Sequence, residues 1–406
     1  MIFHRPEAPL PPARLTPTSQ VEQTLPKPTG ILLGQSTHWD LHALPNPHVV
    51  VIGASGSGKT QTLKAMAHEL ANYGRKQILI IDFHGDQSVP DEVVYPLHMA
   101  SPHGLNPLTV NPDPEGGGPH LQAIQVAMLI RKALTLGPIQ EGHLLETLKE
   151  IYLKHGILQS QPSTWQQDAT SRRWREPPTF AHLEKAIQER IEAGSSDYTK
   201  LQIKLAATFS YGIFSRPQPS LWVNNLIRID VSKLPPALGS IAAESLAHQL
   251  MNQHRLLGES PAKIFLFIDE AKEMPKTSGS ALDRIIMDGR KYGLALILAS
   301  QSERHLSKDV IANSATKIVL PVDQTEVKTV ARKFRFAEYL IAQLKPLSAL
   351  VRLGSQAAQV DILPYYRRVE SPQNSVLSPQ PKETDHQAQT DSEGTDRLQN
   401  PGRASP

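Results

Sequence analysis

The stretch that decides the fold of this chain is His48-Val49-Val50-Val51-Ile52 followed by Gly53-Ala54-Ser55-Gly56-Ser57-Gly58-Lys59-Thr60. The apolar, β-branched run predicts a buried strand, and the residues from Lys59 to about Asn72 predict a helix. Between them, three glycines allow the backbone to curl so that successive N–H groups point at one anion. This order of strand, loop and helix is the setting in which the pattern GxxxxGK[ST] binds phosphate. The sequence therefore predicts a site for a nucleoside triphosphate.

The side chains at the end of this loop have expected parts in binding. Lys59 would reach the β- and γ-phosphates, and the Thr60 hydroxyl would ligate Mg²⁺. The N-terminal dipole of the following helix favours the same anion. The phosphates would lie against the backbone of Gly53, Ala54, Ser55, Gly56, Ser57 and Gly58.

Two adjacent carboxylates follow a second apolar run. Lys263-Ile264-Phe265-Leu266-Phe267-Ile268 predicts a buried strand, and Asp269 and Glu270 stand at its carboxyl end. In parallel sheets that edge is where ligands bind. Asp269 would hold Mg²⁺ through its water shell, and Glu270 would be the general base for the attacking water. The alternative is a surface turn in which Asp269 caps the next helix.

A third apolar run, Leu294 to Ser300, ends at Gln301. An amide at that edge lies near a γ-phosphate and can report whether the phosphate is present. Before the run, Arg284 and Arg290 lie on or just after a helix predicted over residues 281–288. These basic residues are either a solvated helix face or an arginine finger that reaches across a subunit boundary.

Further segments occur in order with these motifs. They are Ile81-Asp82-Phe83-His84-Gly85-Asp86, Leu105-Asn106-Pro107-Leu108, Asp269-Glu270-Ala271, and Gly289-Arg290-Lys291-Tyr292-Gly293 through Ser300-Gln301. Together with the phosphate loop, they resemble the HerA/FtsK superfamily of hexameric pumping ATPases. The resemblance covers about residues 30–360. It is closest to the HerA-like branch and to the conjugation motors, which are the coupling proteins and the VirB4-type ATPases.

The resemblance implies an α/β fold, a RecA-like P-loop NTPase with a parallel sheet and helices on both faces. An extra strand is expected between the strand of the phosphate loop and the strand of the acid pair. Members of the superfamily form rings, place ATP between neighbouring subunits, and drive DNA or in some cases protein through a central channel. ATP and Mg²⁺ are therefore the expected cofactors.

The resemblance also implies roles for matching positions. Lys59 and Thr60 match the Walker A pair, Asp269 and Glu270 the Walker B pair, and Gln301 the sensor glutamine. Arg290 stands where the coupling proteins have an arginine that acts in a neighbouring subunit, with Arg284 as the alternative. An arginine supplied in this way raises the rate about 10³–10⁵-fold in other phosphate-loop enzymes. The expected catalytic set is thus Lys59, Glu270, Arg290 and Gln301.

One segment departs from the family pattern. Asp82 and His84 match the Asp-Pro-His-Gly segment of the family, but Phe83 replaces the usual proline. Asp82 either has a part in the site or only caps and bridges at the end of its strand.

Length and composition limit the remaining possibilities. The chain has 406 residues, enough for two domains or for one large α/β domain with an insert and tails. It has no cysteine, which excludes disulfides and thiolate metal sites and fits a reducing cytosol. A formal charge of +3 gives no overall basic field, so contact with DNA has to be local.

No apolar run approaches the roughly 20 residues of a membrane helix, and the first residues lack a signal-peptide core. We therefore expect a cytoplasmic protein without an integral membrane segment. No metal-ligand spacing such as HExxH is present either, so Mg²⁺ with the nucleotide is the only metal that the sequence implies.

The expected domain organisation has three parts. Residues 1–29 hold seven prolines and predict an extended arm. Residues 30–364 form the RecA-like ATPase domain, in which about residues 120–215 have a helical pattern and predict an inserted subdomain. Residues 365–406 are polar without apolar periodicity and predict a disordered tail.

Two basic clusters interleave aromatic residues with arginines. They are Arg172-Arg173-Trp174-Arg175 and Arg332-Lys333-Phe334-Arg335-Phe336. Each is either a contact for nucleic acid, by stacking and phosphate binding, or a solvated face around a packed aromatic ring.

The sequence and the resemblance together predict a homo-hexameric ATPase that translocates DNA, with a nuclease, a relaxase or a secretion complex as possible partner. One alternative is a VirB4-like ATPase that energises protein export. Another is a scaffold whose nucleotide site switches assembly. The presence of Glu270, Gln301 and Arg290 together counts against the scaffold, because a switch needs fewer groups that stabilise a transition state.

Overall fold

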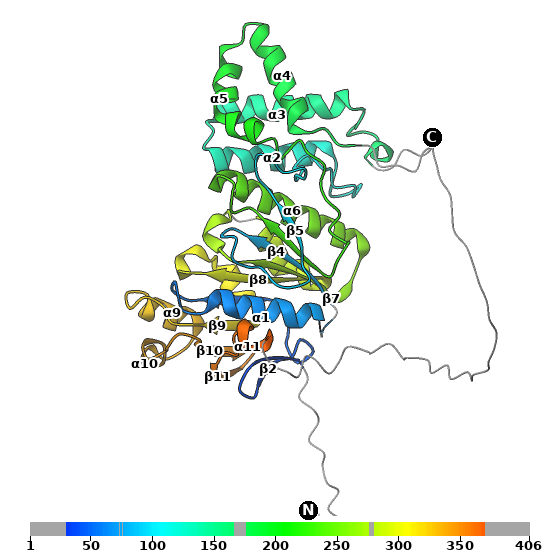
Figure 1. The fold of residues 1–406 in the computed structure, drawn as a ribbon. Coiled ribbons are helices and arrows are strands. Elements are labelled where there is room, and N and C mark those ends of the chain that lie inside the picture. Colours follow the sequence, from blue (N-terminus) through cyan, green and yellow to red (C-terminus); the bar gives the residue numbers. More distant parts are fainter. Residues whose placement is uncertain (1–29, 73, 75, 166–175, 276–279, 370–406) are drawn as a thin grey trace, which may run out of the picture. The chain divides into compact units, whose positions relative to one another are not determined.

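The computed structural model describes residues 30–72, 74, 76–165, 176–275 and 280–369 of the chain. Its centre is a nine-stranded sheet with the strand order β11-β10-β9-β3-β8-β7-β4-β6-β5 (Figure 1). A two-stranded sheet pairs β1 with β2. The strands are β1 (Ile31–Gly34), β2 (Thr37–Trp39), β3 (Val49–Ile52), β4 (Gln77–Asp82), β5 (Val93–Pro96), β6 (Leu226–Asp230), β7 (Ser260–Ile268), β8 (Tyr292–Ser300), β9 (Thr316–Val319), β10 (Ser348–Leu353) and β11 (Gln356–Asp361).

Seven neighbouring strands of the large sheet, from β9 to β5 in the spatial order, run parallel. β10 pairs antiparallel with β9, and β11 pairs antiparallel with β10. The last two strands form a hairpin whose short turn contains Gly354 at a φ of +60°. The expected α/β fold is confirmed, with an antiparallel hairpin added at one end of the parallel sheet.

The strand order brings the predicted motifs together. β8 lies between β3, which precedes the phosphate loop, and β7, which precedes the acid pair. This is the extra strand that the family resemblance implies. Because β3, β8, β7 and β4 are parallel, their carboxyl ends meet at one edge of the sheet, here called the carboxyl edge. The opposite edge, where the same strands begin, is called the amino edge.

Helices cover both faces of the sheet, as expected (Figure 1). On one face, α1 buries Met66 and Leu70 together with the β1–β2 sheet. On the other face, Leu246 of α6, Ile285 of α7 and Phe334 of α9 share one core. The helices are α1 (Lys59–Asn72), α2 (Pro119–Leu134), α3 (Pro138–Lys154), α4 (Phe180–Glu192), α5 (Ser196–Tyr211), α6 (Pro236–Leu257), α7 (Ala281–Asp288), α8 (Lys308–Asn313), α9 (Val327–Phe334), α10 (Glu338–Ala342) and α11 (Tyr365–Val369).

The segment predicted as a helical insert contains α2, α3, α4 and α5. These helices pack on one another, and α2 also packs on α6 of the sheet domain (Figure 1). The hydroxyl of Tyr152 on α3 donates a hydrogen bond of 2.8 Å to the carbonyl of Leu108, which joins the helices to the loop before them. That the four helices form a separate inserted subdomain stays a proposal.

The predicted boundary of the tail is wrong by five residues. Residues 365–369 form α11, in which Tyr365 and Arg368 are buried. The guanidinium of Arg368 pairs with Glu69 of α1, and a buried cation of this kind holds its backbone in place. The arm 1–29, residues 370–406 and the cluster Arg172–Arg175 lie outside the described residues. None of the helices in the described ranges is both long enough and apolar enough to cross a membrane.

A buried cation joins the ends of β4 and β6. The guanidinium of Arg228 on β6 contacts Asp82 at 3.0 Å, Glu92 at 2.9 Å and Asp230 at 3.4 Å. The side chain of Arg228 is 9% exposed, and that of Asp82 is fully buried. Asp82, Glu92 and Asp230 therefore share one arginine as their cationic partner.

Replacement of Arg228 by Met should lower the free energy of unfolding by about 3–5 kcal/mol, because it removes the cation that pairs with the buried carboxylates. The matched control is Arg190→Met, which removes an exposed pair with Glu150 and should cost less than about 1 kcal/mol. Urea unfolding followed by circular dichroism measures both. Equal effects of the two substitutions would contradict a structural role for the Arg228 network.

Candidate active site

The phosphate loop joins β3 to α1 in a tight curl. Gly56 has a φ of +75° and Gly58 a φ of +106°, which are left-handed conformations that side chains disfavour. At Gly58 a Cβ atom would also lie 2.6 Å from the Cδ2 atom of Leu347. The backbone amide of Leu347 donates to the carbonyl of Ser57 at 2.9 Å, so this residue covers the loop from the outside. Leu347 was not recognisable from the sequence, because 289 residues separate it from Gly58.

The ammonium group of Lys59 lies over this loop. Its Nζ atom donates to the carbonyls of Gly53 at 2.7 Å and Ala54 at 2.9 Å. Burial lowers the pKa of Lys59, and the neighbouring Glu270 and Asp86 act in the opposite direction. A phosphate would compensate this partly buried cation better than two carbonyl dipoles do.

Asp269 and Glu270 follow β7 directly, and both side chains are buried. The Oδ1 atom of Asp269 accepts a hydrogen bond of 3.1 Å from the amide of Phe83, whereas Oδ2 is buried and has no hydrogen-bond partner among the described residues. Burial, followed by the charge of the nearby Asp82, raises the pKa of Asp269 well above its usual value. A carboxylate in this state needs a positive partner to stay ionised.

The side chains around Asp269 fit Mg²⁺. Carboxylate oxygens of Asp82, Asp86 and Asp269 lie within 4.8 Å of one another, and the Thr60 hydroxyl donates to Asp86 at 3.1 Å. Oxygen ligands of this kind suit Mg²⁺, and the unpartnered oxygen of Asp269 offers it a ligand. Thr60 and Asp269 were the predicted ligands. Asp86 is an additional candidate that stood in the quoted motif without a role.

Asp82 has a structural role in this arrangement. Its Oδ1 atom accepts from the amides of His84 at 3.1 Å and Gly85 at 2.7 Å. Its Oδ2 atom accepts from the amide of Gln87 at 3.0 Å and from Arg228. Of the two alternatives that the sequence left open, bridging at the end of the strand is the one that the structure supports.

Glu270 has two neighbours on one of its oxygens. The amide Nε2 of Gln301 donates to Oε2 at 2.9 Å, and the Nε2 atom of His84 lies 3.5 Å from the same oxygen. The other oxygen, Oε1, is buried and has no hydrogen-bond partner among the described residues. Its hydrogen-bonding capacity is therefore not used by the described residues. Gln301 thus bonds to the acid pair from the neighbouring strand.

These groups line a cavity of about 480 Å³ at the carboxyl edge, a size typical of small-molecule sites. The cavity brings together residues from four strand ends. Its lining is Ser55, Gly56, Gly58, Lys59, Thr60, Gln61, Leu63, His84, Asp86, Gln87, Asp269, Glu270 and Gln301. Of the predicted loop residues, Gly53, Ala54 and Ser57 do not line it. Gly53 and Ser57 are buried beneath the loop surface.

Solved structures have the same fold. VirB4 of Thermoanaerobacter pseudethanolicus superposes with a TM-score of 0.67 at 19% identity, over 82% of this chain and 96% of that chain. The plasmid coupling protein TrwB in complex with ADP and Mg²⁺ superposes with a TM-score of 0.56 at 18% identity, over 83% of this chain and 89% of that chain. At these identities the likeness concerns the fold alone.

Relatives by sequence agree with this fold. The family model DUF87, described as the central domain of helicase HerA, matches residues 35–127. The DNA double-strand break repair helicase HerA of Sulfolobus acidocaldarius is 23% identical over 72% of this chain and 59% of that protein. The probable helicase MJECL08 of Methanocaldococcus jannaschii is 25% identical over 68% of this chain and 58% of that protein. The chain is therefore similar to P-loop ATPases of the HerA/FtsK type. It spans about three fifths of the length of the curated relatives that it matches.

Arg290 lies at the amino edge, in a short turn over Gly289–Lys291 just before β8. Burial and the nearby charge of Arg290 lower the pKa of His48, which precedes β3, to about 4. β8 has nine residues, and at about 3.3 Å per residue it separates Arg290 from Gln301 by about 30 Å. Arg290 therefore does not reach the cavity of its own chain.

Arg284, the alternative arginine, lies on α7 as predicted. Its side chain is half-buried and makes no hydrogen bond or ion pair with a described residue. The segment between Arg284 and Arg290 thus carries two arginines, of which only Arg290 is exposed at the amino edge.

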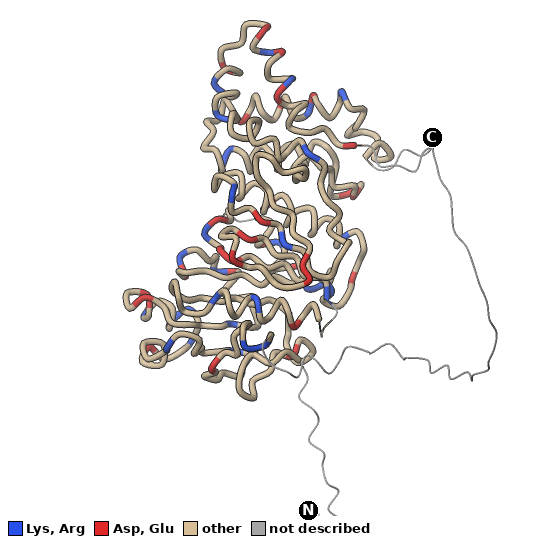
Figure 2. Tube along the Cα trace, viewed as in Figure 1, with Lys and Arg blue, Asp and Glu red and all other residues tan. Residues whose placement is uncertain are grey.

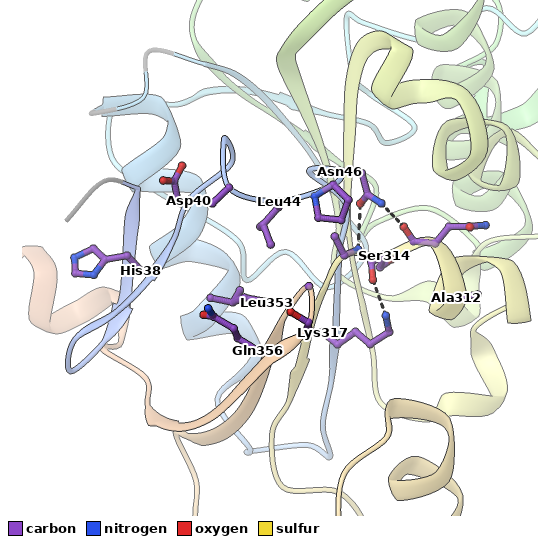
Figure 3. Close-up of a pocket in the computed structure, with 15 residues that line it drawn as sticks. His38, Asp40, Leu44, Asn46, Ala312, Ser314, Lys317, Leu353 and Gln356 are labelled. Carbon is purple, nitrogen blue, oxygen red and sulfur yellow. Dashed lines mark hydrogen bonds between the residues drawn. The ribbon is translucent and has the colours of Figure 1, made fainter. Parts of the chain in front are cut away.

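A larger cavity of about 660 Å³ lies away from the phosphate loop (Figure 3). Figure 3 shows Lys317 bonded to the carbonyl of Ser314, and Asn46 bonded to the backbone of Asn313 and Ala315. These polar groups are satisfied by the protein itself, unlike the orphaned carboxylate oxygens at the carboxyl edge. The smaller cavity is therefore the candidate active site.

The second basic cluster of the sequence separates in the structure. Phe334 is buried in the core, and Lys333 pairs with Glu303. Arg332 and Arg335 stay exposed. In the view of Figure 2, basic and acidic residues are mixed along the described chain. This agrees with the small formal charge of the whole sequence.

Replacement of Lys59 by Ala should weaken ATP binding by at least about 100-fold, because a charge-assisted contact to two phosphates is lost. The matched control is Lys204→Ala, which removes an exposed lysine of α5 and should leave the affinity unchanged. Titration with a fluorescent ATP analogue measures both. Unaltered affinity of the Lys59 variant would contradict the phosphate-loop assignment.

Proposed function

We propose that this chain is the subunit of a homo-hexameric ring that hydrolyses ATP and moves DNA. One observation carries the proposal. The pocket with Glu270 and Gln301 lies at the carboxyl edge, whereas the exposed Arg290 lies at the amino edge of the same sheet. Within one chain, Arg290 therefore cannot lie beside the acid pair Asp269-Glu270. Neighbours packed head to tail in a closed ring supply it to one another.

Each residue of the pocket has a part in hydrolysis. The phosphate loop and Lys59 bind the phosphates, and Thr60, Asp86 and Asp269 would hold Mg²⁺. The bound ion would neutralise negative charge on the phosphates during hydrolysis. The free Oε1 atom of Glu270 takes the proton of the attacking water.

Gln301 and the neighbour's arginine complete the arrangement. The amide of Gln301 donates a hydrogen bond to the Oε2 atom of Glu270. A bound γ-phosphate would compete with Glu270 for this amide. The guanidinium of Arg290 from the next subunit stabilises the charge of the transferred phosphoryl group. ATP cleavage is then coupled to the contact between subunits.

DNA is the proposed substrate because the sequence relatives are named as a DNA repair helicase and a probable helicase. The formal charge of +3 offers no basic field over the whole molecule. DNA contacts would therefore be local, and the exposed Arg332 and Arg335 are candidates. Translocation through a ring needs only such local contacts, repeated in every subunit.

A VirB4-type motor that energises protein export is the second candidate. The observation in its favour is the formal charge of +3, which offers no overall basic field for DNA, and the fold that the chain shares with VirB4 is compatible with it. The two candidates differ in the polymer that stimulates hydrolysis.

An ATPase assay with and without double- and single-stranded DNA, on protein sized by light scattering, separates these candidates. The proposed DNA motor has the mass of a hexamer and turns over faster with DNA. A ring whose turnover ignores both forms of DNA favours the export motor. A monomer that hydrolyses ATP at full rate under every condition contradicts the ring itself.

Replacement of Arg290 by Ala should keep ATP affinity and reduce turnover by about 10³-fold, since the cation acts only on the transition state. Glu270→Gln should also abolish turnover. Mixing the two inactive variants should restore part of the activity, because some interfaces then combine an intact Glu270 with an intact Arg290. Lys291→Ala is the control for a neighbouring exposed charge. Mixed rings without activity would contradict action between subunits.

A further inference from the structure

The loop that follows β4 touches both carboxylates at the end of β7. The amide of Phe83 donates to the Oδ1 atom of Asp269 at 3.1 Å, and the Nε2 atom of His84 lies 3.5 Å from the Oε2 atom of Glu270. β4 and β7 are neighbouring parallel strands, which explains why their ends meet. Two successive residues of one loop thus contact two successive acids of another.

A buried carboxylate holds this loop in place. Asp82 is fully buried and accepts hydrogen bonds from the amides of His84, Gly85 and Gln87. Gly85 has a φ of +77°, which allows the chain to turn back towards Asp82. The ion pair of Asp82 with Arg228 fixes the carboxylate in turn. The backbone that carries Phe83 and His84 is therefore positioned independently of any ligand.

Phe83 contributes through its backbone as well as its ring. The ring packs against the main core and faces α6, where a Cβ atom at Gly239 would lie 3.4 Å from it. The amide points the other way and occupies Oδ1 of Asp269. A proline at position 83, which the family pattern has, lacks this donor. In this chain, Asp269 is thus held by one oxygen. Its other oxygen, Oδ2, has no hydrogen-bond partner among the described residues, and Asp269 lines the cavity.

His84 acts on the second acid from the side opposite Gln301. Gln301 follows β8 and His84 follows β4, and these strands flank β7. Both side chains approach the same oxygen of Glu270, which leaves Oε1 free. The ring of His84 is 46% exposed and the carboxylate of Glu270 is 1% exposed, so His84 contacts this acid from the solvent side. The hydrogen bond of Gln301 and the contact of His84 restrain this carboxylate from both sides, and Glu270 lines the cavity.

We propose that Phe83 and His84 are positioning residues for hydrolysis, Phe83 orienting Asp269 for the metal ion and His84 orienting Glu270 for the water. The proposal rests on the proposed ATP hydrolysis at this site. Residues that hydrogen-bond to a metal ligand and so orient it typically change metal affinity or activity by about 10–100-fold. The two residues act on different steps, and each has its own measurement.

Replacement of His84 by Ala should reduce kcat about 10-fold and leave unchanged both the KM for ATP and the affinity for a non-hydrolysable ATP analogue. His84→Gln keeps a donor at a similar reach and should recover most of the rate. His120→Ala, an exposed histidine of α2, is the matched control and should behave as the unaltered protein.

A His84→Ala variant with full kcat, or a Gln variant as slow as the Ala variant, overturns the role of His84. These outcomes differ from failure of the proposed function, in which the unaltered protein itself does not hydrolyse ATP. Loss of analogue affinity in the Ala variant also overturns it, because it indicates a role in binding rather than in positioning Glu270.

Phe83 is tested with Phe83→Pro, which removes the amide donor, and with Phe83→Leu, which keeps it. In the presence of the non-hydrolysable analogue, the Pro variant should bind Mn²⁺ about 10-fold more weakly, as measured by electron paramagnetic resonance. The Leu variant should bind Mn²⁺ like the unaltered protein. Equal Mn²⁺ affinity of both variants overturns the role of the amide. Loss of affinity in the Leu variant also does so, because it attributes the effect to the ring. Melting curves establish that both variants are folded.

Discussion

The parallel pairing of β3, β8, β7 and β4 is the constraint on which the rest of this structure depends. Each strand is buried towards its carboxyl end and leads into a functional segment: the phosphate loop, Gln301, the pair Asp269-Glu270, and the loop of Phe83 and His84. Because the strands point the same way, their carboxyl ends meet, and segments far apart in the sequence become neighbours. The apolar interior keeps these ends in register, since a slip of one residue would exchange the two faces of a strand.

Gathering so many acids at one edge has an electrostatic cost, and the molecule offsets it in two ways. Arg228 and the amides of the loop after β4 compensate Asp82 permanently. Asp269 and Glu270 are compensated only in part, and each keeps a buried oxygen without a partner among the described residues. Burial accordingly raises the pKa of Asp269. The partners of Asp82 thus fix the loop after β4 in place. The unpartnered oxygens of Asp269 and Glu270 are suited to bind a cation and a water molecule.

The same sheet separates the groups that hydrolysis needs. β8 carries Gln301 at one end and the turn with Arg290 at the other, so its length keeps the arginine away from the acid pair of the same chain. In the proposed ring this separation is an advantage, because cleavage then depends on contact with the next subunit. The proposed roles of Phe83 and His84 add control from inside the chain. Hydrolysis would require both an intact neighbour and a correctly placed loop after β4.

The sequence by itself determined the local part of this protein. The strand, loop and helix around Gly53–Thr60, the helix over 281–288 and the acids at the end of β7 were predictable, because neighbouring residues specify them through apolar periodicity and glycine content. Only the tertiary structure decided that Leu347 covers Gly58, that Arg228 neutralises Asp82, and that the loop after β4 reaches residues 186 positions away. It also decided the antiparallel hairpin of β10 and β11 and the extent of α11. These features arise from packing between distant segments, which leaves no periodic trace in the chain.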